Sequence, residues 1–146
     1  ESFTKNLSND LEPSEKKFWG EVNKFNTDGY FITTSTTSDP TLRFGKKPYL
    51  INTNYFDHIP YHPHTVDHVR IILEKIYNIE FDNPPTKYLS KINDEWIIET
   101  FENRSQVEWM DLGNKYNISG LIVPSNWEIN VINKISSDKY TLYKLK

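Results

Sequence analysis

The segment 120-GLIVPS-125 constrains the fold of this chain more than any other stretch, because its apolar residues follow one another without a charged side chain between them. A strand with one face in water alternates apolar and polar side chains, whereas a strand of a parallel sheet, covered on both faces, is an unbroken apolar run. The segment therefore predicts a buried strand in a parallel sheet with helices on its faces.

Apolar residues at helical spacing predict the helices. We expect helices at residues 14–26, 65–79 and 105–117, and two shorter helical pieces around 86–92 and 94–102. Each of the three longer segments begins with a residue that can cap the first turn, namely Ser14, Thr65 or Ser105. Glu108 follows Ser105 at the spacing of a capping box, which strengthens the third start.

Short runs rich in aromatic and β-branched residues predict the remaining strands. They are expected at residues 30–34 and 48–53, with a C-terminal hairpin over residues 129–145. The polar residues 35–47 are expected to form a loop. The order of these elements predicts an α/β fold with a mixed, mainly parallel central sheet, helices on its faces and a C-terminal antiparallel hairpin.

One domain is expected, because 146 residues suffice for one core of ordinary size. Residues 1–13 are polar and aperiodic, so we expect a linker or disordered N-terminus there and a single α/β domain over residues 14–146. The chain begins at Glu1 rather than Met, which favours a mature product or a fragment of a longer protein. No apolar run approaches the roughly 20 residues that span a bilayer.

The composition and the missing motifs exclude several functions. The chain has no cysteine, which rules out disulfides, thiolate metal sites and cysteine nucleophiles. Its formal net charge of -3 gives no basic surface, so nucleic acid is not an expected partner. The sequence also lacks GxGxxG, P-loop, GxSxG and HExxH motifs, which leaves nucleotide binding, serine hydrolysis and zincin chemistry without support.

All four histidines lie in the segment 55-YFDHIPYHPHTVDH-68, which raises the question of a metal site. His62 and His64 are two residues apart, so they face the same way on an extended chain. His64 precedes the predicted cap at Thr65, so it is not expected to share a helical face with His68. The candidate ligands for a divalent metal such as zinc are His58, His62, His64 and Asp67. The alternatives are a stiff strand-to-helix turn fixed by two prolines, and contact with a ligand without a metal.

A basic segment, 39-DPTLRFGKKP-48, is a second candidate site. Arg43 presents forked donors that suit phosphate or carboxylate, and with Lys46 and Lys47 it could form a lip that binds an anion. The alternative is a charged loop in water. The candidate ligand-binding residues are Arg43, Lys46, Asp57 and Tyr61, since open α/β sheets place their sites beyond the ends of strands.

Two tryptophans are expected in different settings. Trp109 lies on the apolar face of the helix at 105–117 and is expected in the core. Trp127 follows the apolar strand, a position that suits a lid or an interface. Sugar stacking is an alternative role for such rings.

Most of the chain resembles a known group of proteins. The run 103-NRSQVEWMDLGNKYNISGLIVPSNWEI-129, followed by 139-KYTLYKL-145, is similar to the C-terminal soluble domains of bacterial polytopic membrane proteins. These proteins look like the GT-C class of glycosyltransferases that use lipid-linked sugars, and like relatives of that class of unknown function. The earlier runs 30-YFITT-34 and 43-RFGKKPYLINTNYFDHIPY-61 are similar as well, so the resemblance covers roughly residues 16–145.

The resemblance implies a role without catalysis. In GT-C proteins the catalytic acid lies in a membrane-proximal loop near the first transmembrane helices, and this chain holds no such segment. Arg43, Asp57, Pro60 and Tyr61 match the pattern of the group, whereas the histidines from His62 onward are not part of it. The resemblance therefore implies an extracytoplasmic domain, tethered by the membrane part of the same protein, that helps to bind or position a lipid-linked sugar.

Three functions follow from these observations. The first expectation is a non-catalytic soluble domain of a larger membrane protein, periplasmic or on the cell surface. The second is a free-standing module that binds an anionic or sugar ligand at the loops after residues 30–34 and 48–53. The third is a small His/Asp metal-dependent enzyme, which alone of the three needs a cofactor.

Overall fold

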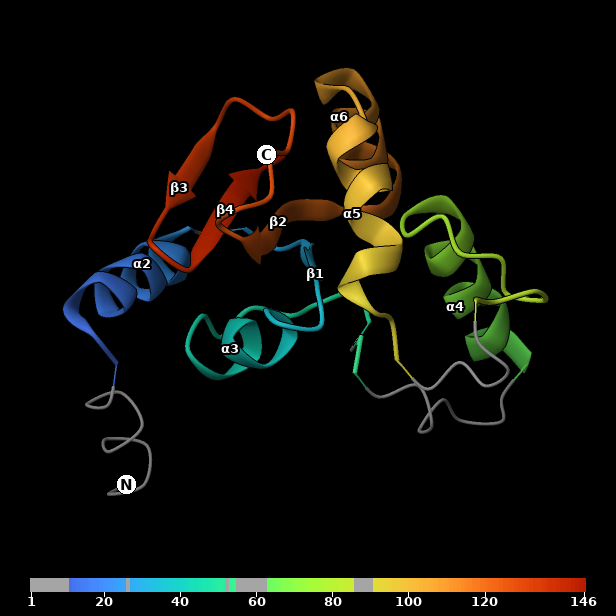
Figure 1. Ribbon diagram of the computed structural model, residues 1–146, viewed down its shortest axis with the longest axis horizontal. Helices are drawn as coiled ribbons and strands as arrows, with labels where there is room; N and C mark the ends of the chain where they lie inside the picture. Colours follow the sequence, from blue (N-terminus) through green and yellow to red (C-terminus); the bar gives the residue numbers. More distant parts are fainter. Residues whose placement is uncertain (1–10, 26, 52, 55–62, 86–90) are drawn as a thin grey trace.

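The computed structural model describes residues 11–25, 27–51, 53–54, 63–85 and 91–146. For residues 63–67 it describes the backbone only. In these parts of the chain the helices are α2 (Pro13–Lys24), α3 (Ser38–Arg43), α4 (Pro63–Lys75), α5 (Asp94–Asn103) and α6 (Gln106–Tyr116). The strands are β1 (Tyr30–Thr33), β2 (Ile118–Pro124), β3 (Lys134–Ser136) and β4 (Tyr140–Lys144) (Figure 1).

The four strands form one mixed sheet in the order β1-β2-β4-β3. Only β1 and β2 pair in parallel, whereas β2 with β4 and β3 with β4 are antiparallel. The α/β class and the C-terminal hairpin are therefore confirmed, and the expectation of a mainly parallel sheet is wrong. The apolar run of β2 identifies a strand covered on both faces, but it carries no information on the direction of the strand beside it. The last strand of the hairpin takes that place.

Helices cover both faces of the sheet, as predicted (Figure 1). Successive residues of a strand point to opposite faces, and Phe31 and Ile32 of β1 accordingly enter two separate apolar clusters. Phe31 packs with Phe18, Trp19 and Val22 of α2. On the other side, Ile32 belongs to a larger cluster with apolar residues of α4, α5 and α6. The unbroken apolar sequence of β2 follows from this double cover.

Two helices begin earlier than their predicted caps, and both begin at a proline. α2 has Glu12 at the N-cap and Pro13 at its first position, so Ser14 lies inside the helix. α4 begins at Pro63 rather than after Thr65. Proline is favoured at the first helical position because its fixed φ suits the helix and its missing N–H would have no partner there. At the third start Ser105 accepts a hydrogen bond from the backbone N–H of Glu108 over 3.2 Å, which confirms that cap.

Two stretches of the first half differ from expectation. The predicted loop 35–47 contains the short helix α3. Among the described residues of the predicted strand 48–53, only Tyr49 forms a β-bridge, to Phe31. The local sequence favoured a loop because the segment is rich in serine, threonine, glycine and lysine. Buried hydroxyl contacts with the end of β1 stabilise the helical turn. Of the two short helical pieces, α5 confirms the second, and residues 86–90 of the first lie outside the described residues.

The two tryptophans share one setting. Trp109 is fully buried, as predicted. Trp127 is only 4% exposed, and its ring lies 5.9 Å from that of Phe101 in an edge-to-face arrangement. The expectation of a lid or interface for Trp127 is therefore wrong. The residues after β2 fold back onto α5, which buries a ring that the local sequence leaves at a strand end.

Candidate functional site

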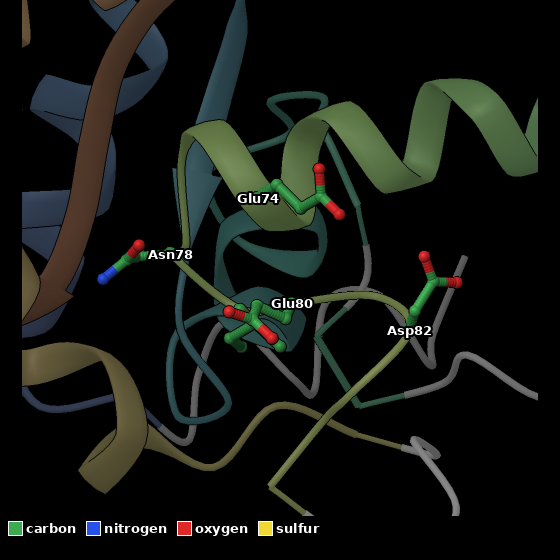
Figure 2. A pocket seen from close by; sticks show the side chains of 5 residues that line it. Glu74, Asn78, Glu80 and Asp82 are labelled. Carbon is green, nitrogen blue, oxygen red and sulfur yellow. The ribbon is translucent and has the colours of Figure 1, made fainter.

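A pocket of about 420 Å³ lies where the chain leaves α4. It is lined by Glu74, Asn78, Ile79, Glu80 and Asp82. Figure 2 shows the carboxylates of Glu74, Glu80 and Asp82 around one space, with Asn78 on the other side of the turn from Asp82. The pocket is open to solvent, and oxygen atoms dominate its rim.

The local sequence explains why polar side chains gather there. Asn78 adopts a left-handed backbone conformation with φ of 55°, a conformation that Asn tolerates better than most residues. It follows the buried Tyr77 and turns the chain out of the helix. The segment 78–82 then alternates polar and apolar residues, and Asn78, Glu80 and Asp82 are exposed whereas Ile79 between them is buried.

The end of α4 is held in place by α5 and the turn that follows α5. Arg104 donates a hydrogen bond through Nη2 to the carbonyl oxygen of Lys75 over 3.0 Å. Such a bond satisfies one of the carbonyl groups that have no partner at the end of a helix. The amide of Asn78 reaches Thr100 Oγ1 of α5 at 3.5 Å. These contacts fix the backbone of the pocket on its inner side.

The charges of the pocket are unevenly compensated. Asp82 forms an ion pair with Arg70, with 2.7 Å between Oδ2 and Nη1. The guanidinium of Arg70 also lies 4.6 Å from the centre of the Phe81 ring. Glu74 and Glu80 form no ion pair within 4.0 Å among the described residues, so the pocket keeps negative charge. It suits ligand groups that donate hydrogen bonds.

A buried network of hydroxyl groups lies at the end of β1. Thr33 Oγ1 is 2.7 Å from Ser38 Oγ, and Ser38 Oγ is 2.8 Å from Thr53 Oγ1. The Tyr77 hydroxyl donates to the carbonyl oxygen of Thr33 over 2.8 Å. All four residues are buried and each hydroxyl named has a partner. The network joins the turn after α4 to β1 and α3, which indicates a structural role.

Burial raises the pKa of the Tyr77 hydroxyl above its ordinary value of 10.0, and the charge of Asp94 acts in the same direction. The hydrogen bond to the carbonyl oxygen of Thr33 lowers the pKa, but by less than burial raises it. The folded protein therefore holds the Tyr77 proton at a pH where the unfolded chain has released it. Below pH 10 this difference leaves stability unchanged, and above pH 10 it lowers stability as the pH rises.

We expect the free energy of unfolding to fall above pH 10 by up to about 1.4 kcal/mol per pH unit because of Tyr77. Tyr77→Phe should remove the part of this fall in the free energy of unfolding that Tyr77 causes. Urea unfolding of both proteins at several values between pH 8 and pH 11 measures the difference in slope. Equal slopes above pH 10 would show that the Tyr77 hydroxyl ionises in the folded protein.

The predicted metal ligands fall largely outside the described residues. His58 and His62 lie there, while His64 and Asp67 belong to α4 through their backbone. Because α4 begins at Pro63, His64 and His68 are four residues apart on one helix, contrary to the expectation from the predicted cap. No group of three or more His, Asp or Glu residues in the described part of the chain is placed to hold a metal. The metal site remains a prediction.

The predicted anion-binding residues are also only partly described. Asp57 and Tyr61 lie outside the described residues. Arg43 ends α3 and pairs with Asp39 at 3.3 Å, and Lys46 follows in an exposed turn with φ of 52°. Their neighbour Lys47 donates to the carbonyl oxygen of Phe25 over 2.8 Å. That bond satisfies a carbonyl group beyond the end of α2. The anion-binding role of this segment stays a prediction.

Comparisons with known proteins found no match for this chain. No protein-family model matches it, and neither do curated proteins or solved structures. The resemblance to GT-C proteins therefore stays a prediction. Within the described residues, no helix combines the length and the apolar character needed to cross a membrane.

The sequence interpretation missed every polar residue of the pocket. It assigned no role to Glu74, Asn78, Glu80 or Asp82. The signal was the alternation of polar and apolar residues directly after a helix. That pattern predicts one polar side on an extended chain, but it does not predict that the helix end forms the opposite wall.

Proposed function

We propose that this chain is a non-catalytic carbohydrate-binding domain of a larger membrane protein, which helps to position the substrate in lipid-linked sugar transfer. The pocket at the end of α4 is the observation that supports the binding role. The wider setting rests on the sequence resemblance alone. It comprises the tether to the membrane part of the same protein, the position outside the cytoplasm and the lipid-linked sugar.

The chemistry of the pocket suits a sugar because sugar hydroxyl groups both donate and accept hydrogen bonds. Glu74 and Glu80 offer carboxylate oxygens without an ion-pair partner among the described residues. Hydrogen bonds to a carboxylate are about twice as strong as those between neutral groups. A volume of about 420 Å³ falls in the range of small-molecule sites. The pocket therefore supports a ligand that is neutral and rich in hydroxyl groups.

A titration with free sugars, followed by amide chemical shifts, tests this proposal. Glucose, galactose, mannose and N-acetylglucosamine are added up to high millimolar concentration. We expect at least one of them to shift the amides of residues 74–82 in a saturable way. Glu80→Ala should weaken that binding about tenfold or more, because a lost hydrogen bond to a charged group costs roughly 1.5–3 kcal/mol.

A matched variant and a second probe give the test its controls. Asp111→Ala removes an exposed carboxylate of α6 outside the pocket and should leave the affinity unchanged. Spermidine probes the competing class of ligand, an organic cation. If spermidine shifts the amides of residues 74–82 and no sugar does, the pocket is a cation site and the carbohydrate proposal is rejected.

A further inference from the structure

A second hollow, of about 300 Å³, lies on α2, remote in sequence from the pocket described above. It is lined by Leu11, Lys16, Trp19, Gly20, Asn23 and Phe44. The side chain of Asn23 donates to the carbonyl oxygen of Phe44 over 3.1 Å. This bond holds α2 against the turn that follows α3 and so fixes the two walls.

Gly20 keeps this hollow open. It lies in the middle of α2 and has no positive φ, so the backbone there does not require glycine. A Cβ atom added at Gly20 would meet no other atom within 4 Å. Glycine in a helix interior is less favourable than alanine. The structural effect of Gly20 is therefore to leave space beside Trp19 and Phe44.

Two of the six residues that line the hollow are aromatic. The rings of Trp19 and Phe44 lie 6.3 Å apart at an angle of 40°. Trp19 is only 3% exposed, and its indole N–H is buried. Phe44 is partly exposed and therefore offers a ligand more accessible ring surface than Trp19 does. Flat rings beside a glycine backbone suit a planar aromatic ligand.

The charge at the rim is positive. Lys16 lines the hollow and forms no ion pair within 4.0 Å among the residues that the structure describes. Lys47 Nζ lies 3.5 Å from the carbonyl oxygen of Asn23, which places a second ammonium group beside another lining residue. An anionic group on the ligand would therefore meet Lys16 at the mouth of the hollow.

We propose that this hollow binds a planar aromatic ring that carries a carboxylate. The ring lies on the backbone at Gly20, against Trp19 and Phe44, and the carboxylate faces Lys16. The site is independent of the carbohydrate pocket at the end of α4, so either proposal can fail without the other.

A titration with 2-naphthoate, followed by amide chemical shifts, tests the site. We expect saturable shifts at residues 16–23 and at Phe44. Gly20→Ala should weaken binding at least tenfold because its methyl group occupies the space for the ring. The same substitution should raise the melting temperature by roughly 2–4 °C, so lost binding cannot be ascribed to unfolding.

The charge is tested by variants and by a neutral analogue. Lys16→Gln should weaken binding of 2-naphthoate about fivefold, while Lys17→Gln, at the exposed neighbouring position, should leave it unchanged. The uncharged 2-naphthamide should bind the wild-type protein about as weakly as 2-naphthoate binds Lys16→Gln. Unchanged affinity in Gly20→Ala, or saturable shifts confined to other residues, would overturn the site. Equal affinity for the acid and the amide would overturn the choice of an anionic ligand.

Discussion

Trp109→Ala is expected to lower the free energy of unfolding by about 3–5 kcal/mol, the range found for large aromatic residues removed from a core. Trp109 is fully buried, and its ring meets that of Phe101 edge-to-face at 5.1 Å. Its indole N–H donates to the carbonyl oxygen of Phe101 over 3.3 Å. The Arg104 guanidinium lies 4.7 Å from the centre of the Trp109 ring. The substitution therefore removes packing, a hydrogen bond and a cation–π contact together.

Urea unfolding of the wild type and the variant measures this loss. Val107→Ala on the same helix is the matched control, because Val107 is 69% exposed. Its effect should stay within about 0.5 kcal/mol, as is usual for surface substitutions. A loss below about 1 kcal/mol for Trp109→Ala would contradict the arrangement of α5 against α6, because removal of a core tryptophan lowers the free energy of unfolding by more than this.

Gly120→Ala is expected to destabilise the protein by about 2–3 kcal/mol, the upper part of the range for overpacked cores. Gly120 lies in β2, between the neighbouring strands β1 and β4. A Cβ atom there would lie 2.7 Å from the carbonyl oxygen of Tyr143 and 3.0 Å from a methyl carbon of Leu142. The oxygen belongs to the backbone of a paired strand, so it cannot move aside without disturbing the sheet.

Gly20→Ala is the matched control for this prediction, because it makes the same chemical change where a Cβ atom meets open space. The two substitutions should change stability in opposite directions, with Gly20→Ala stabilising by about 0.4–1 kcal/mol. Thermal unfolding of both variants beside the wild type measures the difference. A Gly120→Ala protein as stable as the wild type would show that β2 and β4 do not pack in this register.

The pocket at the end of α4 shows how far sequence reasoning reaches toward a site. The alternation of Asn78, Ile79, Glu80, Phe81 and Asp82 could have predicted that the polar side chains are exposed, but not that Asn78 points away from Asp82. The ion pair between Arg70 and Asp82 and the volume of the pocket could not be predicted, because both depend on how the chain folds back along α4. Distances between residues on two elements are set by packing rather than by spacing in the sequence.

The sequence by itself determined those elements whose pattern is repeated over many residues. Periodic apolar residues predicted α2, α4 and α6, and the unbroken apolar run predicted β2. The serine at position 105 predicted the N-cap of α6. These features depend on the preferences of neighbouring residues and on the need to cover an apolar face. A helix or strand of this kind buries its apolar side wherever its neighbours come from.

Only the tertiary structure decided the direction and order of the strands, the helix α3 and the burial of Trp127. β4 lies antiparallel to β2 because the C-terminal hairpin pairs there, a choice between partners that no single strand encodes. α3 forms because Ser38 finds buried partners in Thr33 and Thr53, which come from other parts of the chain. Each of these outcomes depends on the free energy of contacts between separate elements. The pattern of neighbouring residues in the sequence does not indicate that free energy.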